Sequence, residues 1–328
     1  MVKTTLKLGS TTVAYNSSKH PEATNILAEA CYDAGQRAIV GKMCVVLNST
    51  ANNWEASNEE SLATSQQSVE FIRSLDPQGR LVHPCIMPRG GPYCDAELME
   101  GLGEQRRKYD THTQLHMCEA ESDIERMRTV HGSHWSSYSA MYRHHGLMHD
   151  KSIIAHCVHL TPDDFKNLQE TDCGVAHNPN SNTCLRDGEC PVRELLDHGI
   201  KVGLGTDCSA GYMPSVLDAM RQASNVSRHR AIKTGDERSI LSFSELFYLA
   251  TMGGAKVVGM GDKIGNFEKG KRFDALLVDV KGVISADSGL WEGEENQTDA
   301  MVKKFVFLGD DRHIRKVFVD GRIVSGED

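Results

Sequence analysis

The sequence has 328 residues, of which 25% are charged and 39% hydrophobic, and its formal net charge is −9. This acidic balance disfavours nucleic-acid binding, which usually requires a basic face. No apolar run approaches the roughly 20 residues of a membrane-spanning helix, and the first residues lack the apolar core of a signal peptide. The ten cysteines include no C-x-x-C pair, which predicts free thiols in the cytoplasm and excludes a cysteine-ligated zinc deaminase site.

Short apolar runs rich in β-branched residues alternate with helix-like stretches. Helices are expected at residues 21–35, 57–75, 161–172 and 191–199. Serine or Thr-Pro marks the first residues of some of them, and glycine marks the last residue of others. The alternation predicts a parallel sheet, and the number of units predicts an α/β fold of the (β/α)8 barrel type. The expected strands are 11–17, 37–48, 80–89, 111–119, 152–160, 174–182 and 201–208.

A barrel of this type has eight strands, and the pattern gives seven. A helix-like segment at residues 2–9 precedes the first of them. We therefore expect the first barrel strand to be missing from this chain; the alternative is that one strand has been missed in the pattern.

The pattern changes after two further expected helices at 213–227 and 242–260. Residues 264–280 and 303–324 are expected to form strands, with Asp320-Gly321 as the turn of a hairpin, and residues 285–299 a loop. We therefore predict an incomplete (β/α)8 barrel over residues 1–262. Residues 263–328 are predicted to form the carboxyl-terminal strands of a small β-sandwich domain.

Polar side chains follow the carboxyl ends of successive expected strands. In barrels of this type, the catalytic residues lie at these carboxyl ends. Two imidazoles and one carboxylate from three strands can converge on a zinc ion, which lowers the pKa of a bound water to about 7. A separate acid must then protonate the leaving group. The alternatives are that the histidines are core residues and that the aspartate caps the next helix. The candidates are Arg89, His116, Glu119, His156, the segment 177–182 and Asp207.

Three motifs at these strand ends resemble the amidohydrolase superfamily, in the branch that deaminates purines and triazines: IIAHCVHLT (153–161), HNPNSN (177–182) and GLGTDCSAG (203–211). Within that branch the chain is most similar to the guanine deaminases of eukaryotes, from about residue 6 onward. The similar stretches are GQRAIVGKMCVVLN (35–48), PRGGPYCDAELM (88–99), LHMCEAESD (115–123), IGNFEKGKRFDALLVD (264–279) and FLGDDRHIRKVFVDG (307–321).

The resemblance implies a zinc-dependent aminohydrolase that converts guanine to xanthine and ammonia, as a cytoplasmic homodimer. It implies zinc ligands at His116, His156 and Asp207, with one zinc ion per chain or iron in its place. Asp207 and Glu119 would move protons. Arg89 would bind the purine through its fork of donors, and the resemblance places His116, Glu119 and Asn180 at the substrate as well.

Two features of the family pattern are absent from this sequence. The family's remaining zinc ligands lie in an H-x-H on the first barrel strand, and no such motif occurs here. The family usually has a phenylalanine after the arginine of PR, where this chain has Gly90-Gly91. We therefore expect a truncated gene model, a splice product or a degenerate paralogue. Two other functions stay open: a catalytically dead binding partner of a full-length enzyme, and a deaminase of another amino-heterocycle.

Overall fold

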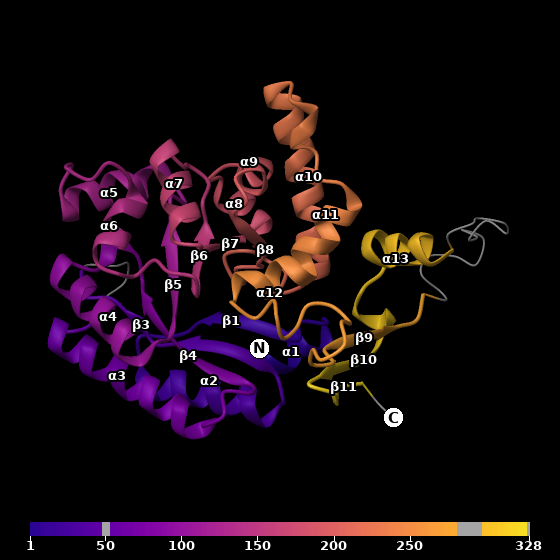
Figure 1. The fold of residues 1–328 in the computed structure, drawn as a ribbon, viewed down its shortest axis with the longest axis horizontal. Coiled ribbons are helices and arrows are strands. Elements are labelled where there is room, and N and C mark those ends of the chain that lie inside the picture. The colour runs from indigo at the N-terminus through magenta and orange to yellow at the C-terminus, as the bar shows by residue number, and fades with distance from the viewer. Residues whose placement is uncertain (48–52, 281–296, 327–328) are drawn as a thin grey trace.

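A computed structural model describes residues 1–47, 53–280 and 297–326. Among these residues, a parallel sheet follows the order β1-β2-β4-β5-β6-β7-β8, and β3 pairs with the end of β4. The sheet curls, with helices along its outer side (Figure 1). Its strands are β1 (Thr12–Asn16), β2 (Arg37–Gly41), β3 (Met43–Cys44), β4 (Val82–Pro88), β5 (His112–Met117), β6 (Ser152–His156), β7 (Gly174–His177) and β8 (Lys201–Leu204).

This sheet confirms the predicted (β/α)8-type architecture and all seven predicted strands. β1 and β8 are the two ends of the strand path, so the sheet does not close into a ring over the described ranges. Several strands end earlier than predicted. Residues 157–160 and 205–208 lie outside β6 and β8, because the backbone leaves the extended region at the polar residues that follow each apolar run.

The four helices predicted between the strands are present, as α2, α3, α7 and α9, with ends within two residues of the predicted ones. Ser57 caps α3 by accepting a hydrogen bond from the Glu60 N–H, and Thr161 and Asp164 form a reciprocal capping box on α7. The helices up to β8 are α1 (Val2–Lys7), α2 (Pro21–Asp33), α3 (Asn58–Leu75), α4 (Ala96–Tyr109), α5 (Glu121–His131), α6 (Tyr138–His144), α7 (Pro162–Glu170), α8 (Pro179–Leu185) and α9 (Val192–Asp197).

The prediction of a strand over residues 174–182 is wrong beyond His177, because α8 begins at Pro179. Proline fixes φ near its helical value and lacks an N–H, so it suits the first position of a helix. Residues 179–182 of the HNPNSN motif are therefore carried on a short helix that follows the end of β7.

The last part of the chain adds helices and a small antiparallel sheet of order β11-β10-β9. The Asp320-Gly321 turn joins β10 to β11, as predicted. The strand prediction is wrong over residues 303–308, which belong to α13, and over residues 264–274, which precede β9. The predicted loop at 285–299 lies mostly outside the described residues. The elements are α10 (Val216–Thr234), α11 (Phe243–Tyr248), α12 (Gly254–Val257), β9 (Ala275–Val278), α13 (Gln297–Leu308), β10 (Ile314–Val319) and β11 (Arg322–Ser325).

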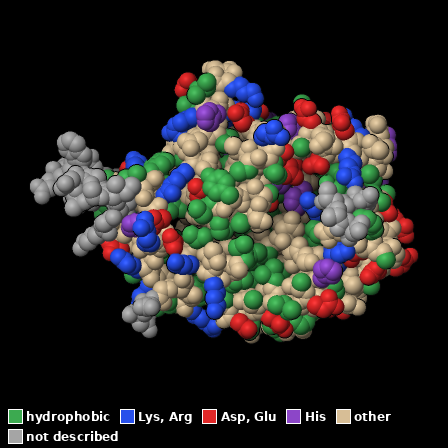
Figure 2. Space-filling view, turned by 180° about the vertical axis from the view of Figure 1, so that it is seen from behind, with side chains coloured by type: hydrophobic (Ala, Val, Ile, Leu, Met, Phe, Trp, Pro, Cys, Tyr) green, Lys and Arg blue, Asp and Glu red, His purple; other side chains and the backbone are tan. Residues whose placement is uncertain are grey.

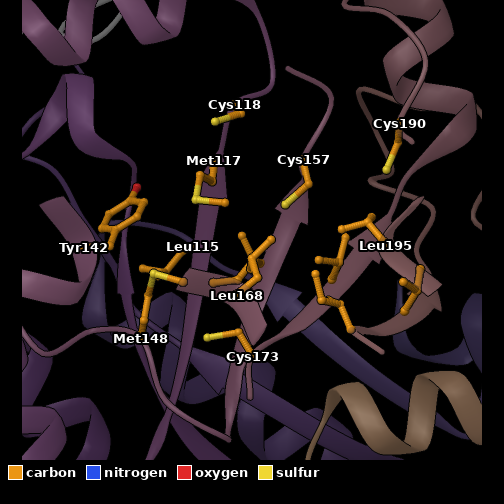
Figure 3. Close-up of a cluster of buried hydrophobic side chains, with 14 of the residues drawn as sticks. Leu115, Met117, Cys118, Tyr142, Met148, Cys157, Leu168, Cys173, Cys190 and Leu195 are labelled. Carbon is orange, nitrogen blue, oxygen red and sulfur yellow. The ribbon is translucent and has the colours of Figure 1, made fainter. Parts of the chain in front are cut away.

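The main hydrophobic core lies between the sheet and its outer helices. In Figure 3, Leu115 and Met117 of β5 point toward Tyr142, Met148 and Leu168, and all of these side chains are buried. Burial of a large apolar side chain contributes roughly 1.5–3 kcal/mol. This packing fixes the strands and thereby the positions of the residues that follow them.

Over the described ranges, no helix combines the length and the apolar character that crossing a bilayer requires. Basic and acidic side chains are interspersed over the face shown in Figure 2. This mixture agrees with the acidic net charge and gives no support to a nucleic-acid surface on that face.

Candidate active site at the carboxyl ends of the strands

Neighbouring parallel strands bring the predicted residues to one edge of the sheet. His116 and His156 lie at the ends of β5 and β6, where Met117 pairs with His156. His177 ends β7, and Asp207 follows β8. His156 and Asp207 have φ values of 74° and 46°. Such a left-handed backbone is uncommon for residues other than glycine, costs about 1–3 kcal/mol and clusters at functional sites.

Three side chains converge at this edge: His156, Glu119 and Asp207. His156 Nε2 lies 3.4 Å from Glu119 Oε1 and 4.0 Å from Asp207 Oδ2. His156 is fully buried, and its Nε2 has no hydrogen-bond partner. A buried polar atom without a partner is costly, and one imidazole with two carboxylates is a donor set for a divalent cation. These residues therefore fit a zinc ion.

His116 lies beside this group and is half-buried near the end of β5. Its ring centroid is 5.4 Å from that of His156, and its Nε2 is 3.3 Å from Asn16 Nδ2. Burial and the neighbouring His156 lower the pKa of His116 well below its usual value, which favours the neutral form that a metal requires. Among the described residues, the group of closely spaced ligand atoms is Glu119, His156 and Asp207. The ligand set with His116 stays a prediction.

Arg89 follows β4 and lines a small cleft together with His116 and Glu119. Its guanidinium lies over the Tyr93 ring, 5.1 Å from the centroid. Gly90 has a φ of 149°, which a side chain other than glycine rarely adopts. The Gly90-Gly91 turn therefore has a backbone role in presenting Arg89 to the cleft.

Asn180 was predicted to bind substrate, and its side chain is occupied elsewhere. Its Nδ2 donates to Asp218 Oδ2 at 3.1 Å, and its Oδ1 accepts from the Tyr212 N–H at 3.2 Å. Asn180 thus joins α8 to the loop before α10 and to α10 itself, and its role toward substrate stays a prediction.

Sequence reasoning missed two residues that contact the convergent group. Asn182 Oδ1 lies 2.9 Å from His156 Nδ1, and Ser181 Oγ donates to Asp207 Oδ2 at 2.7 Å. Both belong to the HNPNSN motif, which supplied the signal, but the motif alone does not say which side chain faces the site.

The site is rich in carboxylates, and burial shifts their titration. Desolvation raises the pKa of Glu119, with Asp187, Asp123 and Asp207 adding to the effect and His156 opposing it. Desolvation also raises the pKa of Asp123, which Arg89 opposes. Glu119 is therefore suited to hold and release a proton closer to neutral pH than an exposed glutamate.

Comparison with known proteins identifies the family. The profile described as "Amidohydrolase family" matches residues 1–324. The chain belongs to the amidohydrolase family. This amidohydrolase is 40% identical to a probable guanine deaminase of Schizosaccharomyces pombe over 327 residues, which cover 99% of this chain and 61% of that protein. It is 37% identical to the guanine deaminase of Homo sapiens over 328 residues, which cover 99% of this chain and 71% of that protein.

Solved structures agree with this assignment. The amidohydrolase superposes with a TM-score of 0.88 and 31% identity on guanine deaminase from C. acetobutylicum, a structure with guanine in its active site, covering 99% of this chain and 74% of that one. The E. coli guanine deaminase structure gives a TM-score of 0.86 and 30% identity, covering 98% and 72%. The chain thus spans between about three fifths and three quarters of the length of these relatives.

Proposed function

We propose that this chain is a zinc-dependent aminohydrolase that converts guanine to xanthine and ammonia. The observation that carries the proposal is the convergence of Glu119 and Asp207 on the unpartnered His156 Nε2, at 3.4 and 4.0 Å. The printed names of its relatives, guanine deaminases of fungi, mammals and bacteria, support the substrate.

His116, His156 and Asp207 are the proposed zinc ligands. All three lie at the same end of the sheet, and the unpartnered Nε2 of His156 is free to coordinate. When bound, zinc supplies hydroxide at neutral pH by lowering the pKa of a water. Three protein ligands are enough for a catalytic zinc site, which keeps a further position open.

The chain's own residues then handle the substrate and the protons. Arg89 donates hydrogen bonds to the ring carbonyl and nitrogen of guanine, with its guanidinium oriented by Tyr93. Asp207 accepts a proton from the attacking water as the water oxygen bonds to the ring carbon that bears the amino group. Glu119 carries a proton to that amino group. The carbon–nitrogen bond breaks, ammonia leaves, and xanthine remains.

The organisation, location and assembly of the protein are part of the proposal. We place the hydrolase unit at residues 1–262 and the small β unit at 263–328, which includes the three-stranded sheet. All ten cysteines are free, which supports a cytoplasmic location and a role in purine catabolism there. β1 and β8 are the edge strands of the main sheet. Edge strands favour association with another chain, which supports a homodimer.

A substrate panel with metal analysis tests this function. Purified chain supplied with zinc is assayed with guanine, adenine and an amino-triazine, beside Arg89→Lys, which keeps the charge but loses the planar fork. We expect zinc near one ion per chain, turnover of guanine in preference to the others, and a higher KM for guanine in Arg89→Lys. Turnover of another heterocycle alone would establish the alternative substrate class. Guanine binding without turnover would establish the inactive binding partner.

A further inference from the structure

Two consecutive residues of α8 each bond one of the convergent side chains. Ser181 Oγ donates to Asp207 Oδ2 at 2.7 Å, and Asn182 Oδ1 lies 2.9 Å from His156 Nδ1. Ser181 and Asn182 are 0% and 1% exposed, so water does not compete for these bonds. One short helix thus contacts the ends of both β6 and β8.

The Asn182 amide is placed with its oxygen toward His156 Nδ1, and this placement favours a proton on Nδ1. An amide oxygen only accepts hydrogen bonds, so Nδ1 must be the protonated nitrogen of the neutral ring. Nε2 then keeps its lone pair, and Nε2 is the atom that faces Glu119 and Asp207. The other tautomer would place a proton at that position and a lone pair against the amide oxygen.

The bond from Ser181 orients the carboxylate. Asp207 Oδ2 accepts a hydrogen bond from the Ser181 hydroxyl. The same Oδ2 atom lies 4.0 Å from His156 Nε2. A hydroxyl that donates to a carboxylate stabilises its charged form and restricts its rotation. Asp207 has a left-handed φ of 46°, and Ser181 provides a fixed side-chain contact for it.

The Asn178 side chain, at the N-cap of α8, packs closely against the backbone of Gly205 after β8. Gly205 lies between Leu204 and Asp207, and a Cβ atom there would be 2.1 Å from Asn178 Oδ1. The Gly205 N–H donates to the His177 carbonyl at 2.8 Å. A side chain at residue 205 would displace the Asn178 amide, so the GLGTD segment and the HNPNSN segment pack directly against each other.

We propose that Ser181 and Asn182 are positioning residues, with Asn182 fixing His156 as the Nδ1-protonated tautomer and Ser181 orienting Asp207 Oδ2. The inference rests on the proposed function for the roles of His156 and Asp207. The tautomer itself can be measured in the metal-free protein, independently of any activity.

The first experiment is nitrogen NMR of the metal-free chain labelled with ¹⁵N-histidine, with the His156 signals assigned by their loss in His156→Gln. We expect the Nδ1-protonated pattern in the wild type and in Asn182→Asp, which keeps an oxygen acceptor. In Asn182→Leu the preference is lost; Asn182→Ala serves if that variant does not fold. An Nε2-protonated wild type, or a pattern unchanged in both apolar variants, overturns the proposal.

The second experiment measures zinc affinity by chelator competition and guanine turnover. Loss of a hydrogen-bond partner behind a metal ligand typically lowers metal affinity or activity 10–100-fold. We expect a loss of this size in Asn182→Leu and Ser181→Ala, and recovery in Asn182→Asp and Ser181→Thr. Thr183→Val is the control, because the Thr183 hydroxyl donates to the Pro179 carbonyl of its own helix. Wild-type protein with the expected tautomer but no guanine turnover would reject the proposed function and retain the tautomer assignment. Equal losses in Thr183→Val and Asn182→Leu would contradict the positioning role.

Discussion

The hydroxyl of Tyr142 donates a hydrogen bond to the backbone carbonyl of His116 at 2.9 Å. The Tyr142 hydroxyl oxygen also accepts a hydrogen bond from the Gly91 N–H at 3.1 Å. The Tyr138 hydroxyl oxygen accepts from the same N–H at 3.2 Å. Tyr142 is fully buried in the core between the sheet and the helices. One phenol thus joins the end of β5 to the turn that presents Arg89.

Removal of this hydroxyl should loosen Arg89 relative to the rest of the site. In Tyr142→Phe we expect a rise in the KM for guanine with a smaller change in kcat, and a loss of about 1–3 kcal/mol in unfolding free energy from two buried hydrogen bonds. Tyr138→Phe is the matched control, because Tyr138 contacts Gly91 without bridging to His116. An equal KM in Tyr142→Phe and wild type would show that Arg89 is held by other contacts.

Glu119 should be required for turnover but not for zinc binding. General acid–base catalysis contributes typically 10²–10⁴-fold, so Glu119→Gln should lower kcat by about that factor and leave zinc content near that of the wild type. The raised pKa of Glu119 places a protonated carboxyl closer to neutral pH. The limb of the pH–rate profile that reflects loss of the Glu119 proton should therefore disappear in the variant. Loss of zinc from Glu119→Gln would instead make Glu119 a metal ligand, as its position beside His156 permits.

Buried histidines should make the fold less stable in mild acid. Desolvation lowers the pKa of His83 and of His149 to about 4. Between pH 6.5 and 4 the unfolded chain binds protons at these residues that the folded chain does not, so stability is greatest above pH 6.5 and falls as the pH decreases. Each histidine contributes up to about 1.4 kcal/mol per pH unit.

Urea unfolding at several pH values, with His83→Gln for comparison, measures this effect. We expect a smaller slope of unfolding free energy against pH in the variant. The same slope in both proteins would mean that His83 takes up its proton without unfolding.

A buried ion pair joins the main sheet to the carboxyl-terminal part of the chain. Arg37 at the start of β2 bonds Asp274, with side chains 1% and 7% exposed. Removal of one partner of a buried pair leaves an uncompensated charge and costs about 3–5 kcal/mol. Asp274→Ala should therefore lose about that much unfolding free energy. Glu170→Ala, which breaks the exposed pair with Arg143, should lose at most about 1 kcal/mol. Similar losses in the two variants would contradict the stabilising role of the buried pair.

The sequence predicted the order of the strands and the residues that follow them, because apolar runs and helix-capping residues are local signals. It did not predict α8 or the helix over residues 303–308. In KKFVFL, aromatic and β-branched residues favour a strand, but Phe305 and Val306 pack against the main core as part of α13. Tertiary packing overrides local preference there.

The finer geometry of the site depends on side-chain direction. Asn180 and Asn182 are two residues apart in one motif, so a strand would place them on the same face. On a helix they point apart: Asn182 contacts His156, and Asn180 contacts Asp218. The choice between them follows from where α8 begins, which the pattern alone did not reveal.

The most direct test of the central claim is the conversion of guanine to xanthine by the zinc-supplied 328-residue chain, measured beside Asp207→Ala. The account predicts xanthine and ammonia in equal amounts from the wild type and no measurable turnover from the variant, with both proteins folded. Absence of turnover from folded, zinc-loaded wild type, or equal turnover in both proteins, would contradict it.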